Sequence, residues 1–591
     1  MAEFQAPLDD MRFVINDLVG LDQVTALPGC EETTADLVDA ILEEAGKLGA
    51  EVLAPLNKSG DEEGCLIENG VVRTPKGFKD AYRQYVDGGW NGLSCDTVYG
   101  GQDLPWLVAT AVSEIYHAAN MAFMLNPMLT QGAVELLSHH GSDELKGIYL
   151  ENMISGDWTG TMNLTEPQAG SDLGRIRTKA VPENGHYRIS GTKIFITFGE
   201  HDLTDNIIHM VLARLPDAPP GVKGISLFVV PKFMVNTDGS LGDRNDLRCV
   251  SIEHKLGINA SPTSVMSFGD DGGAIGFLVG QENMGLAYMF TMMNNERLAV
   301  GLQGVGVSER AYQHALAYAR ERVQSRPVDG SSREAVAIIQ HPDVRRMLLS
   351  MRSQTEATRA LAYYVAAQLD LAARHRDQDI RTAAQARVDL LTPVVKAWGS
   401  DTAIEVASLG IQVHGGMGYI EETGAAQYYR DARIAAIYEG TNGIQANDLV
   451  GRKIGRENGE TATTLIADMR ADLESLSEAS SDDLRTICDA VSQGIDDLET
   501  ATAWIVATWP NDPNDVAAGA VPYLRLLALV SGGWMMARAA AISLNGDAGP
   551  FGKEKIASAR FFADHLLAET GGLSRIVTRG SSSVQAAFTN L

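Results

Sequence analysis

The sequence predicts a multidomain α+β protein: an N-terminal helical domain, a middle antiparallel β domain, a helical bundle and an additional C-terminal helical domain. Its apolar residues follow a helical period up to about residue 150, form short alternating or β-branched runs from there to 275, and return to a helical period beyond 280. The strands do not alternate with helices of about 10–15 residues, which excludes a doubly wound parallel sheet. We expect domains at 1–155, 156–275, 276–455 and 456–591.

The first domain opens with a segment, residues 32–60, whose apolar side chains are three and four apart, as in an amphipathic helix. Thr33 or Thr34 is expected to cap its start, and Gly60 to lie beyond its end. Further helical patterns follow at 81–87, 106–117 and 143–153.

Three segments predict strands of the middle domain, and turn-rich pieces such as PENG and PDAPPG separate them. They are HYRISGTKIFIT at 186–197, NIIHMVLARL at 206–215 and KGISLFVVPKF at 223–233. We expect these strands to run antiparallel.

Long amphipathic patterns at 297–324 and 341–375 predict the helical bundle. The string GRENG at 455–459 predicts a linker to the last helical domain. In that domain, the apolar stretch 526–537 is too short to span a bilayer and predicts a buried helix.

The charge is strongly acidic: 48 Lys and Arg against 76 Asp and Glu give a net charge of −28. Such a chain repels nucleic acid and anionic membranes, so neither is an expected partner. Residues 1–275 carry 19 basic and 39 acidic side chains, whereas residues 276–455 carry 19 of each. The neutral segment is therefore the expected place for an anionic ligand.

The five cysteines are scattered, which predicts neither a disulfide framework nor a structural zinc site. The histidines form no ligand pair, and no metal site is expected. The first residues lack the pattern of a secretory leader. We expect a cytoplasmic protein. The glycine-rich string GLQGVG at 301–306 does not follow a strand, so a Rossmann site is not expected there.

Two motifs of the middle region carry groups suited to an anion or a flavin edge. In LTEPQAGSDLG at 164–174, Thr165, Gly170 and Ser171 offer hydroxyls and backbone N–H groups. In SGTKIFIT at 190–197, Phe195 and Thr197 lie two apart and so share a strand face, one to pack on a ring and one to hydrogen-bond its edge. Taken alone, the first could be an ordinary turn and the second an ordinary strand.

Two further motifs lie in the bundle: ERLAVGLQGVG at 296–306, and QVHGGMGYIEE at 412–422 followed by RDARIAAIYEGTNGIQ at 430–445. In the last, Glu439 stands between an apolar run and Gly-Thr. Apolar surroundings disfavour the charged carboxylate and make it a better base for a weakly acidic C–H. The alternative is a salt-bridged surface residue.

Together these motifs resemble the acyl-CoA dehydrogenases, which are FAD flavoproteins. The resemblance covers about residues 80–455, and TEPxxGSD with RDAxxxxIYEGT is a specific pair. The chain length, the C-terminal addition and the strings FQAPLDDMRFVINDLVG, MNNERLAVGLQGVG and YEGTNGIQA resemble a larger subgroup. That subgroup acts on 3-(methylthio)propionyl-CoA in dimethylsulfoniopropionate breakdown.

The resemblance implies the binding residues. For FAD they are Met162, Leu164, Thr165, Phe195, Thr197, Arg322, Gln412, Gly415, Gly416 and Thr441. For the acyl-CoA they are Gly170, Ser171, Asn294, Arg297 and Gly440. In the family a neighbouring subunit supplies part of the pyrophosphate site, which implies a homodimer or larger assembly. Gln324 and Ser325 stand where Thr-Phe is usual, which leaves the contacts there in doubt.

The implied reaction is α,β-dehydrogenation to a trans-2-enoyl-CoA. Glu439 would take the α-proton, the flavin the β-hydride, and the backbone N–H after Glu439 would stabilise the enolate oxygen. Some family members place the base at the position of Glu296 instead. The complete IYEGT context favours Glu439.

Several alternatives remain. The favoured enzyme passes electrons to electron-transfer flavoprotein; an oxygen-using acyl-CoA oxidase or flavin monooxygenase has the same fold, and a catalytically silent assembly protein could retain it. The acyl chain is also open, since butyryl-CoA and longer straight chains compete with the methylthio substrate.

Overall fold

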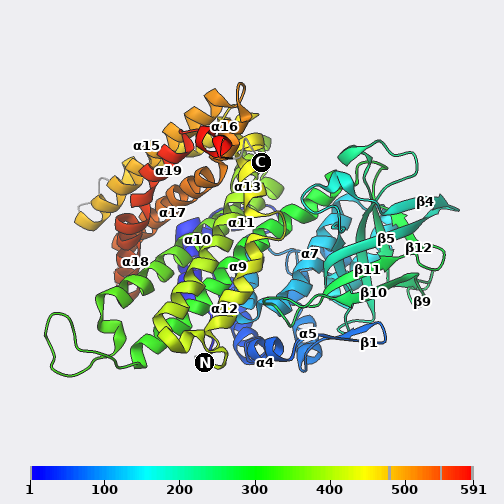
Figure 1. Ribbon diagram of the computed structural model, residues 1–591, viewed down its shortest axis with the longest axis horizontal. Coiled ribbons are helices and arrows are strands. Elements are labelled where there is room, and N and C mark those ends of the chain that lie inside the picture. Colours follow the sequence, from blue (N-terminus) through cyan, green and yellow to red (C-terminus); the bar gives the residue numbers. More distant parts are fainter. Residues whose placement is uncertain (1–2, 477–480, 546–548, 588–591) are drawn as a thin grey trace. The chain divides into compact units, whose positions relative to one another are not determined.

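The computed structural model describes residues 3–476, 481–545 and 549–587. The chain divides into two compact units. Unit 1 comprises Met1–Gly46, Pro105–Ala118 and Arg297–Leu591, and unit 2 comprises Lys47–Leu104 and Ala119–Glu296. Figure 1 labels their elements.

Unit 2 combines helices with an eight-stranded sheet. Its main helices are α4 (Pro55–Glu63), α5 (Phe78–Asp87), α7 (Met121–His140) and α8 (Asp143–Ser155). Its strands are β1 (Leu66–Glu68), β2 (Val71–Arg73), β3 (Trp158–Asn163), β4 (Lys179–Glu183), β5 (His186–Thr197), β6 (Asn206–Ala213), β7 (Ser226–Pro231), β8 (Phe233–Val235), β9 (Leu241–Arg244), β10 (Leu247–Ile252), β11 (Thr263–Phe268) and β12 (Ala274–Leu278).

The main sheet has the order β10-β11-β5-β12-β7-β6-β3, and β4 also pairs with β5 (Figure 1). The predicted antiparallel domain is confirmed, and β5 has the bounds that the sequence predicts. One pair differs: β3 and β6 run parallel, from Trp158 opposite Asn206 to Asn163 opposite Val211. Because β4 and β5 lie between β3 and β6 in the chain, the connection from β3 to β6 is a crossover, not a hairpin.

The segment 32–60 is helical almost throughout, as predicted, but it is not one α-helix: α3 (Ala35–Leu48) continues into a π-helical stretch, Gly49–Leu53, which is followed by α4. Thr34 caps its start, since the Leu37 N–H donates to Thr34 Oγ1 over 3.3 Å. Helix α3 ends at Leu48, and α4 begins at Pro55, whose ring nitrogen cannot donate a helical hydrogen bond. The prediction for Gly60 is wrong, because it lies inside α4, where a Cβ would come within 2.7 Å of the Phe78 ring.

Unit 1 contains the helical bundle and the C-terminal addition. Its helices are α1 (Leu8–Phe13), α2 (Leu21–Thr25), α3 (Ala35–Leu48) up to Gly46, α6 (Trp106–Ala119) up to Ala118, α9 (Gly285–Glu321) from Arg297 onward, α10 (Pro342–Arg374), α11 (Gln378–His414), α12 (Ala425–Ala432), α13 (Asn442–Asp448), α14 (Glu460–Leu476), α15 (Asp482–Thr508), α16 (Pro513–Ala518), α17 (Ala520–Asn545), α18 (Pro550–Phe561), α19 (Thr570–Val577) and α20 (Ser582–Ala586).

The GLQGVG string lies within α9, where its glycines permit close helix packing. A Cβ at Gly304 would collide with the carbonyl oxygen of Gly399 on α11, and one at Gly301 would meet the Val395 backbone. A Cβ at Gly306 would lie 2.7 Å from the backbone nitrogen of Ala118 on α6. These contacts account for the string as a packing motif of helix α9.

The C-terminal addition packs on the bundle within the same unit, with α17 against α10 and α11 (Figure 1). The predicted linker at 455–459 is the turn that connects the π-helical stretch Leu449–Gly455 to α14, and it is packed: a Cβ at Gly455 would lie 2.5 Å from the Trp509 ring. Within α17, the stretch Ala520–Leu544 is long and apolar enough to cross a membrane, yet 89% of its most apolar window is buried. The predicted buried helix is confirmed.

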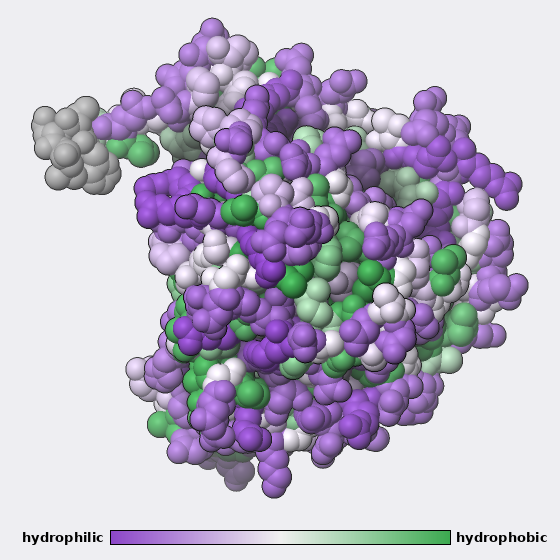
Figure 2. Space-filling model, turned by 90° about the vertical axis from the view of Figure 1, so that its right-hand side faces the viewer, coloured by the Kyte–Doolittle hydropathy of each residue, from purple (hydrophilic) through white to green (hydrophobic). Residues whose placement is uncertain are grey.

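Hydrophilic side chains cover most of the face drawn in Figure 2, with apolar residues gathered around its centre. This distribution suits a net charge of −28. Several charges are nevertheless buried inside unit 1, where they need partners.

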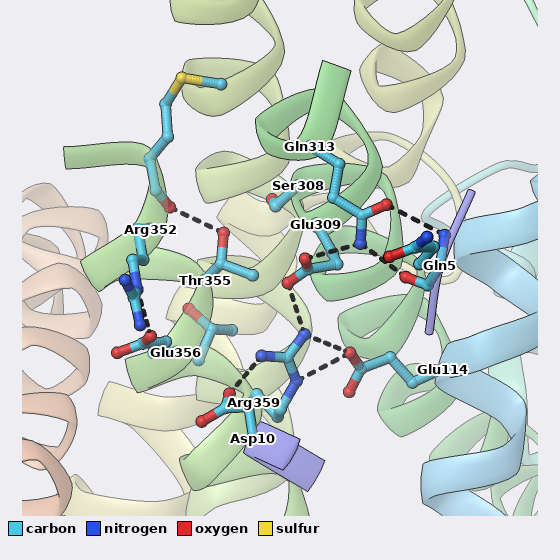
Figure 3. Close-up of polar contacts among 12 residues, drawn as sticks. Gln5, Asp10, Glu114, Ser308, Glu309, Gln313, Arg352, Thr355, Glu356 and Arg359 are labelled. Carbon is cyan, nitrogen blue, oxygen red and sulfur yellow. Dashed lines mark hydrogen bonds and ion pairs between the residues drawn. The ribbon is translucent and has the colours of Figure 1, made fainter. Parts of the chain in front are cut away.

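A buried guanidinium joins four helices of unit 1. Arg359 on α10 donates to Glu114 on α6 over 2.7 and 2.8 Å, to Glu309 on α9 over 2.8 Å, and to Asp10 on α1 over 2.5 Å (Figure 3). Asp10 also pairs with Lys555 on α18, so the cluster reaches the C-terminal addition. The Arg359 side chain is fully buried and is the common partner of three carboxylates. These carboxylates therefore depend on Arg359 to compensate their charge.

Replacing Arg359 with Met is expected to lower the free energy of unfolding by roughly 3–5 kcal/mol, because it leaves buried carboxylates without their cation. Urea denaturation of both proteins measures this. The matched control is Arg470→Met, whose exposed ion pairs with Asp496 and Glu499 contribute about 1 kcal/mol or less. Equal destabilisation by both variants would contradict a structural role for the cluster.

Candidate active site

Strand β5 of unit 2 carries a bulge at the predicted ring-packing aromatic. Between Lys193 and Ile196, β5 has one residue more than its partner β11. Phe195 lies in this bulge with φ 60°, and its side chain is 58% exposed. Ile196 is buried and Thr197 is half-buried, which agrees with the prediction that Phe195 and Thr197 lie on the same face.

The bulge is bonded to the loop that follows β3. The Ile194 N–H donates to the Thr165 carbonyl over 2.9 Å, and Lys193 Nζ donates to the Leu164 carbonyl over 2.9 Å. The structure therefore brings the LTEP motif next to the SGTKIFIT motif. Met162 lies half-buried on β3, two residues before Leu164.

A buried ion pair holds this junction, and sequence reasoning missed it. Lys193 Nζ lies 2.8 Å from Glu166 Oε1, and both side chains are buried. Glu166 also accepts from the backbone N–H groups of Arg177 and Thr178 and from the Thr178 hydroxyl. Burial opposes ionisation of Glu166, but Lys193 and these donors outweigh it and lower its pKa to about 2. Burial also lowers the pKa of Lys193, to about 8.

The remaining predicted residues of unit 2 are exposed. Gly170 and Ser171 lie beyond the Leu164–Glu166 junction, and no atom approaches a Cβ built at Gly170. Asn294 is exposed on α9. Their roles toward a substrate stay predictions.

Glu296 differs in placement from Glu439. It is fully buried in unit 2, where its carboxylate lies so close to α7 that a Cβ at Gly132 would collide with it. This position suits a packing role for Glu296 against α7.

In unit 1, Glu439 lies in a short loop between the turn Arg433–Ala436 and α13. It is half-buried and adopts φ 55°. Burial raises its pKa to about 7, although the positive charges of Arg297 and Lys396 act in the opposite direction. The predicted raised pKa is therefore supported. Arg297 itself is buried on α9.

Buried side chains fix the backbone around Glu439. Lys396 Nζ on α11 donates to the Gly440 carbonyl over 2.8 Å and to Asn442 Oδ1 over 2.9 Å. Gln445 Nε2 donates to the Glu439 carbonyl over 3.0 Å. Thr441 Oγ1 accepts from the Ile444 N–H and so caps α13. Sequence reasoning missed Lys396 and Gln445; the signal was a lysine within the apolar string LTPVVKAW.

The predicted pyrophosphate residues lie at the ends of α9 and α11. Tyr318 on α9 stacks on His414 on α11 with ring centroids 4.4 Å apart, so these two ends are adjacent. Arg322 and Gln412 are exposed, and Arg322 donates to Gln324 Oε1 over 3.2 Å.

The glycines after His414 leave room for a ligand. Gly415 has φ 61°, and no atom lies within 4 Å of a Cβ built at Gly415 or Gly416. An exposed arginine and an open glycine pair are groups that fit a diphosphate. In unit 2, the exposed ring of Phe195 lies on a strand that is hydrogen-bonded to the Leu164–Thr165 loop. This ring, with the backbone of the loop and the Thr197 hydroxyl, offers groups that fit a flavin ring. Each set therefore fits its part of FAD.

Four segments of the chain match models of known domains. Residues 38–157, 161–270 and 283–454 match the N-terminal, middle and C-terminal domains of acyl-CoA dehydrogenase. Residues 465–587 match a model described as acetyl-CoA dehydrogenase C-terminal like.

Whole-chain relatives agree with these matches. A 3-methylmercaptopropionyl-CoA dehydrogenase of Ruegeria pomeroyi is 51% identical over 99% of this chain and 100% of its own. A butyryl-CoA dehydrogenase of Syntrophomonas wolfei is 36% identical over 94% of each chain. The solved Caenorhabditis elegans ACDH-11 with C11-CoA shares the fold, with a TM-score of 0.77, 20% identity, and coverage of 100% of this chain and 97% of that one.

Replacing Glu166 with Gln is expected to lower the free energy of unfolding by roughly 3 kcal/mol at neutral pH, as its lowered pKa implies. Because the folded state holds the ionised form, this contribution is present above the ordinary pKa near 4.5 and is lost as the pH falls toward 2. Urea unfolding of both proteins between pH 7 and pH 3 measures it.

The control is Glu183→Gln, which alters an exposed pair with Arg188 and is expected to change stability little at any pH. A difference between wild type and Glu166→Gln that does not shrink in acid would contradict the assigned ionisation.

Proposed function

The chain belongs to the acyl-CoA dehydrogenase family, and we propose that it converts 3-(methylthio)propanoyl-CoA to 3-(methylthio)acryloyl-CoA with Glu439 as the base. The observation that carries the assignment of the base is the loop itself: a half-buried carboxylate with a pKa near 7, facing Arg297 and Lys396. The family reaction is an FAD-dependent α,β-dehydrogenation of an acyl-CoA thioester.

Glu439 removes the α-proton. A thioester α-proton is far less acidic than a carboxylic acid, so the base benefits from a raised pKa and the developing enolate needs stabilisation. We assign that stabilisation to the Gly440 N–H, which the loop places next to the base in sequence. Arg297 and Lys396 keep a useful fraction of Glu439 ionised near neutral pH.

Bound FAD would supply the acceptor for the β-hydride. Phe195 would pack against its ring, and Thr197, Thr165 and the Leu164 backbone would hydrogen-bond its edge, with Met162 beside them. Arg322, Gln412, Gly415 and Gly416 would hold the pyrophosphate of a partner subunit's FAD, and Thr441 would contact the cofactor beside the base. Gly170, Ser171 and Asn294 would contact the acyl-CoA.

The proposed assembly is a homodimer. The C-terminal addition packs on α10 and α11 and so covers bundle surface that a further pair of subunits would otherwise need. The exposed ends of α9 and α11, with Arg322 and Gln412, remain available to one partner. We further propose a cytoplasmic enzyme without a membrane span, and electron-transfer flavoprotein as the acceptor.

The substrate proposal rests on the Ruegeria pomeroyi relative, whose name specifies the methylthio substrate. Butyryl-CoA is the alternative that the Syntrophomonas wolfei relative suggests.

Glu439→Gln is expected to slow flavin reduction by roughly a thousandfold or more, because a carboxamide cannot accept the proton. FAD should stay bound, as the visible absorbance would show. In wild type the rate should rise as the pH increases through about 7, where the base ionises. Stopped-flow bleaching with excess acyl-CoA measures these rates.

The matched control is Glu296→Gln, which should retain the rate. If Glu296→Gln instead abolished bleaching and Glu439→Gln did not, Glu296 would be the base.

Anaerobic bleaching is expected to be fastest with 3-(methylthio)propionyl-CoA in a panel that includes butyryl-CoA and longer straight chains. Steady turnover should require electron-transfer flavoprotein or a dye, with slow oxygen consumption. A preference for butyryl-CoA would overturn the substrate proposal, rapid oxygen use would identify an oxidase, and no bleaching by any acyl-CoA would indicate an assembly role.

A further inference from the structure

The backbone at the proposed base is strained. Glu439 and Gly440 have φ values of 55° and 82°, so two successive residues adopt the left-handed region. A residue with a side chain rarely adopts that region, and it persists there only where the surroundings hold it. Glu439 is not a glycine, so the protein must supply that restraint.

Two fully buried side chains supply the restraint. Lys396 Nζ donates to the Gly440 carbonyl over 2.8 Å. Gln445 Nε2 donates to the Glu439 carbonyl over 3.0 Å and to the Gly440 carbonyl over 3.2 Å. Both peptide carbonyls of the strained turn are therefore held from the protein interior, one side by α11 and the other by α13.

Lys396 is itself anchored. Its second acceptor is Asn442 Oδ1, at 2.9 Å. The amide nitrogen of Asn442 donates to Asp401 Oδ1 over 2.8 Å, and to Ser400 Oγ over 3.0 Å. The loop from Glu439 to Asn442 is thus attached to one stretch of α11, residues 396–401.

A buried lysine makes these two hydrogen bonds at a high desolvation cost. Its acceptors are the Gly440 carbonyl and the side-chain amide oxygen of Asn442, both neutral groups, and the neutral amide of Gln445 also donates to the Gly440 carbonyl. A buried ammonium costs far more solvation than a neutral amide, and burial lowers the pKa of Lys396 to about 8 while Glu439 and Asp401 act to raise it. The charge therefore has a use beyond holding the turn.

We propose that Lys396 is a positioning residue that fixes the Glu439 turn through the Gly440 carbonyl and supplies a positive charge to the Glu439 carboxylate. This rests on the proposed function, in which Glu439 is the base and the Gly440 N–H serves the substrate oxygen. The Lys396 side chain would then help to orient both the Glu439 carboxylate and the Gly440 N–H.

Other charged groups act on Glu439 or on its two cations. Arg297 on α9 acts on Glu439 directly; Asp448 on α13 and Arg452 in the turn Leu449–Gly455 act on Arg297, and Asp401 on α11 acts on Lys396. Arg297 also favours ionisation of Glu439, so removing Lys396 leaves one cation of the pair. The ionisation of Glu439 should then shift to higher pH and not disappear.

The test compares Lys396→Met, which removes the charge and the donor, with Gln445→Met, which removes only donors. In the full-length FAD-loaded protein, difference infrared spectroscopy follows the protonated carboxyl of Glu439, with Glu439→Gln as the blank. Lys396→Met should move this titration upward by about one pH unit, which corresponds to a tenfold change in the proton-binding constant. Gln445→Met should leave it in place. Both variants should lower kcat by roughly a hundredfold with little change in KM.

The control is Lys453→Met, which removes another lysine of unit 1 and its ion pair with Asp389. This variant should change neither the titration nor kcat. If Lys396→Met fails to fold, Lys396→Gln keeps a neutral donor and should show the same upward shift. An unmoved titration in the Lys396 variants overturns the proposal whether or not acyl-CoA is oxidised. Loss of activity in wild type with the shift intact would instead contradict only the proposed function.

Discussion

The proposed chemistry depends on one electrostatic constraint: Glu439, as the proposed base, must be desolvated enough to accept a proton and yet stay ionised. Burial alone would leave it protonated at neutral pH, and a direct ion pair would make it too weak a base. Cations that act on the carboxylate through their charge resolve this conflict, because they favour the ionised form against the effect of burial. Arg297 on α9 and Lys396 on α11 provide this pair, and burial remains the larger influence on the pKa.

The position of those cations follows from how the bundle packs. Glycines bring α9 and α11 together until backbone touches backbone, as at Gly304 and Gly399. Lys396 lies on α11 within this closely packed region, so its amine has little freedom to move. The base is therefore carried by a loop, but its direction is determined by rigid helices. Such an arrangement gives catalytic precision at the cost of burying an ammonium group.

The sequence predicted features that depend on local pattern and missed those that depend on distant partners. Strand β5 has its predicted ends because alternation is local. The bulge at Phe195 could not be predicted, since it exists only relative to β11. Gly60 was misread for the same reason, because the Phe78 ring that requires it lies in another helix. Lys396 lies 43 residues before Glu439, and only the fold joins them.

The acidic composition has a different meaning once the fold is known. The net charge of −28 seemed unsuited to two polyphosphate ligands. The arginines proposed for those ligands lie within the segment that has equal numbers of acids and bases: Arg297 is on α9, and Arg322 directly follows the end of that helix at Glu321. The buried acid Glu166 has its own cation, Lys193, at 2.8 Å. The excess acid is then free to favour solubility, while the ligand charge would be met locally by an arginine on α9 and another just beyond its end.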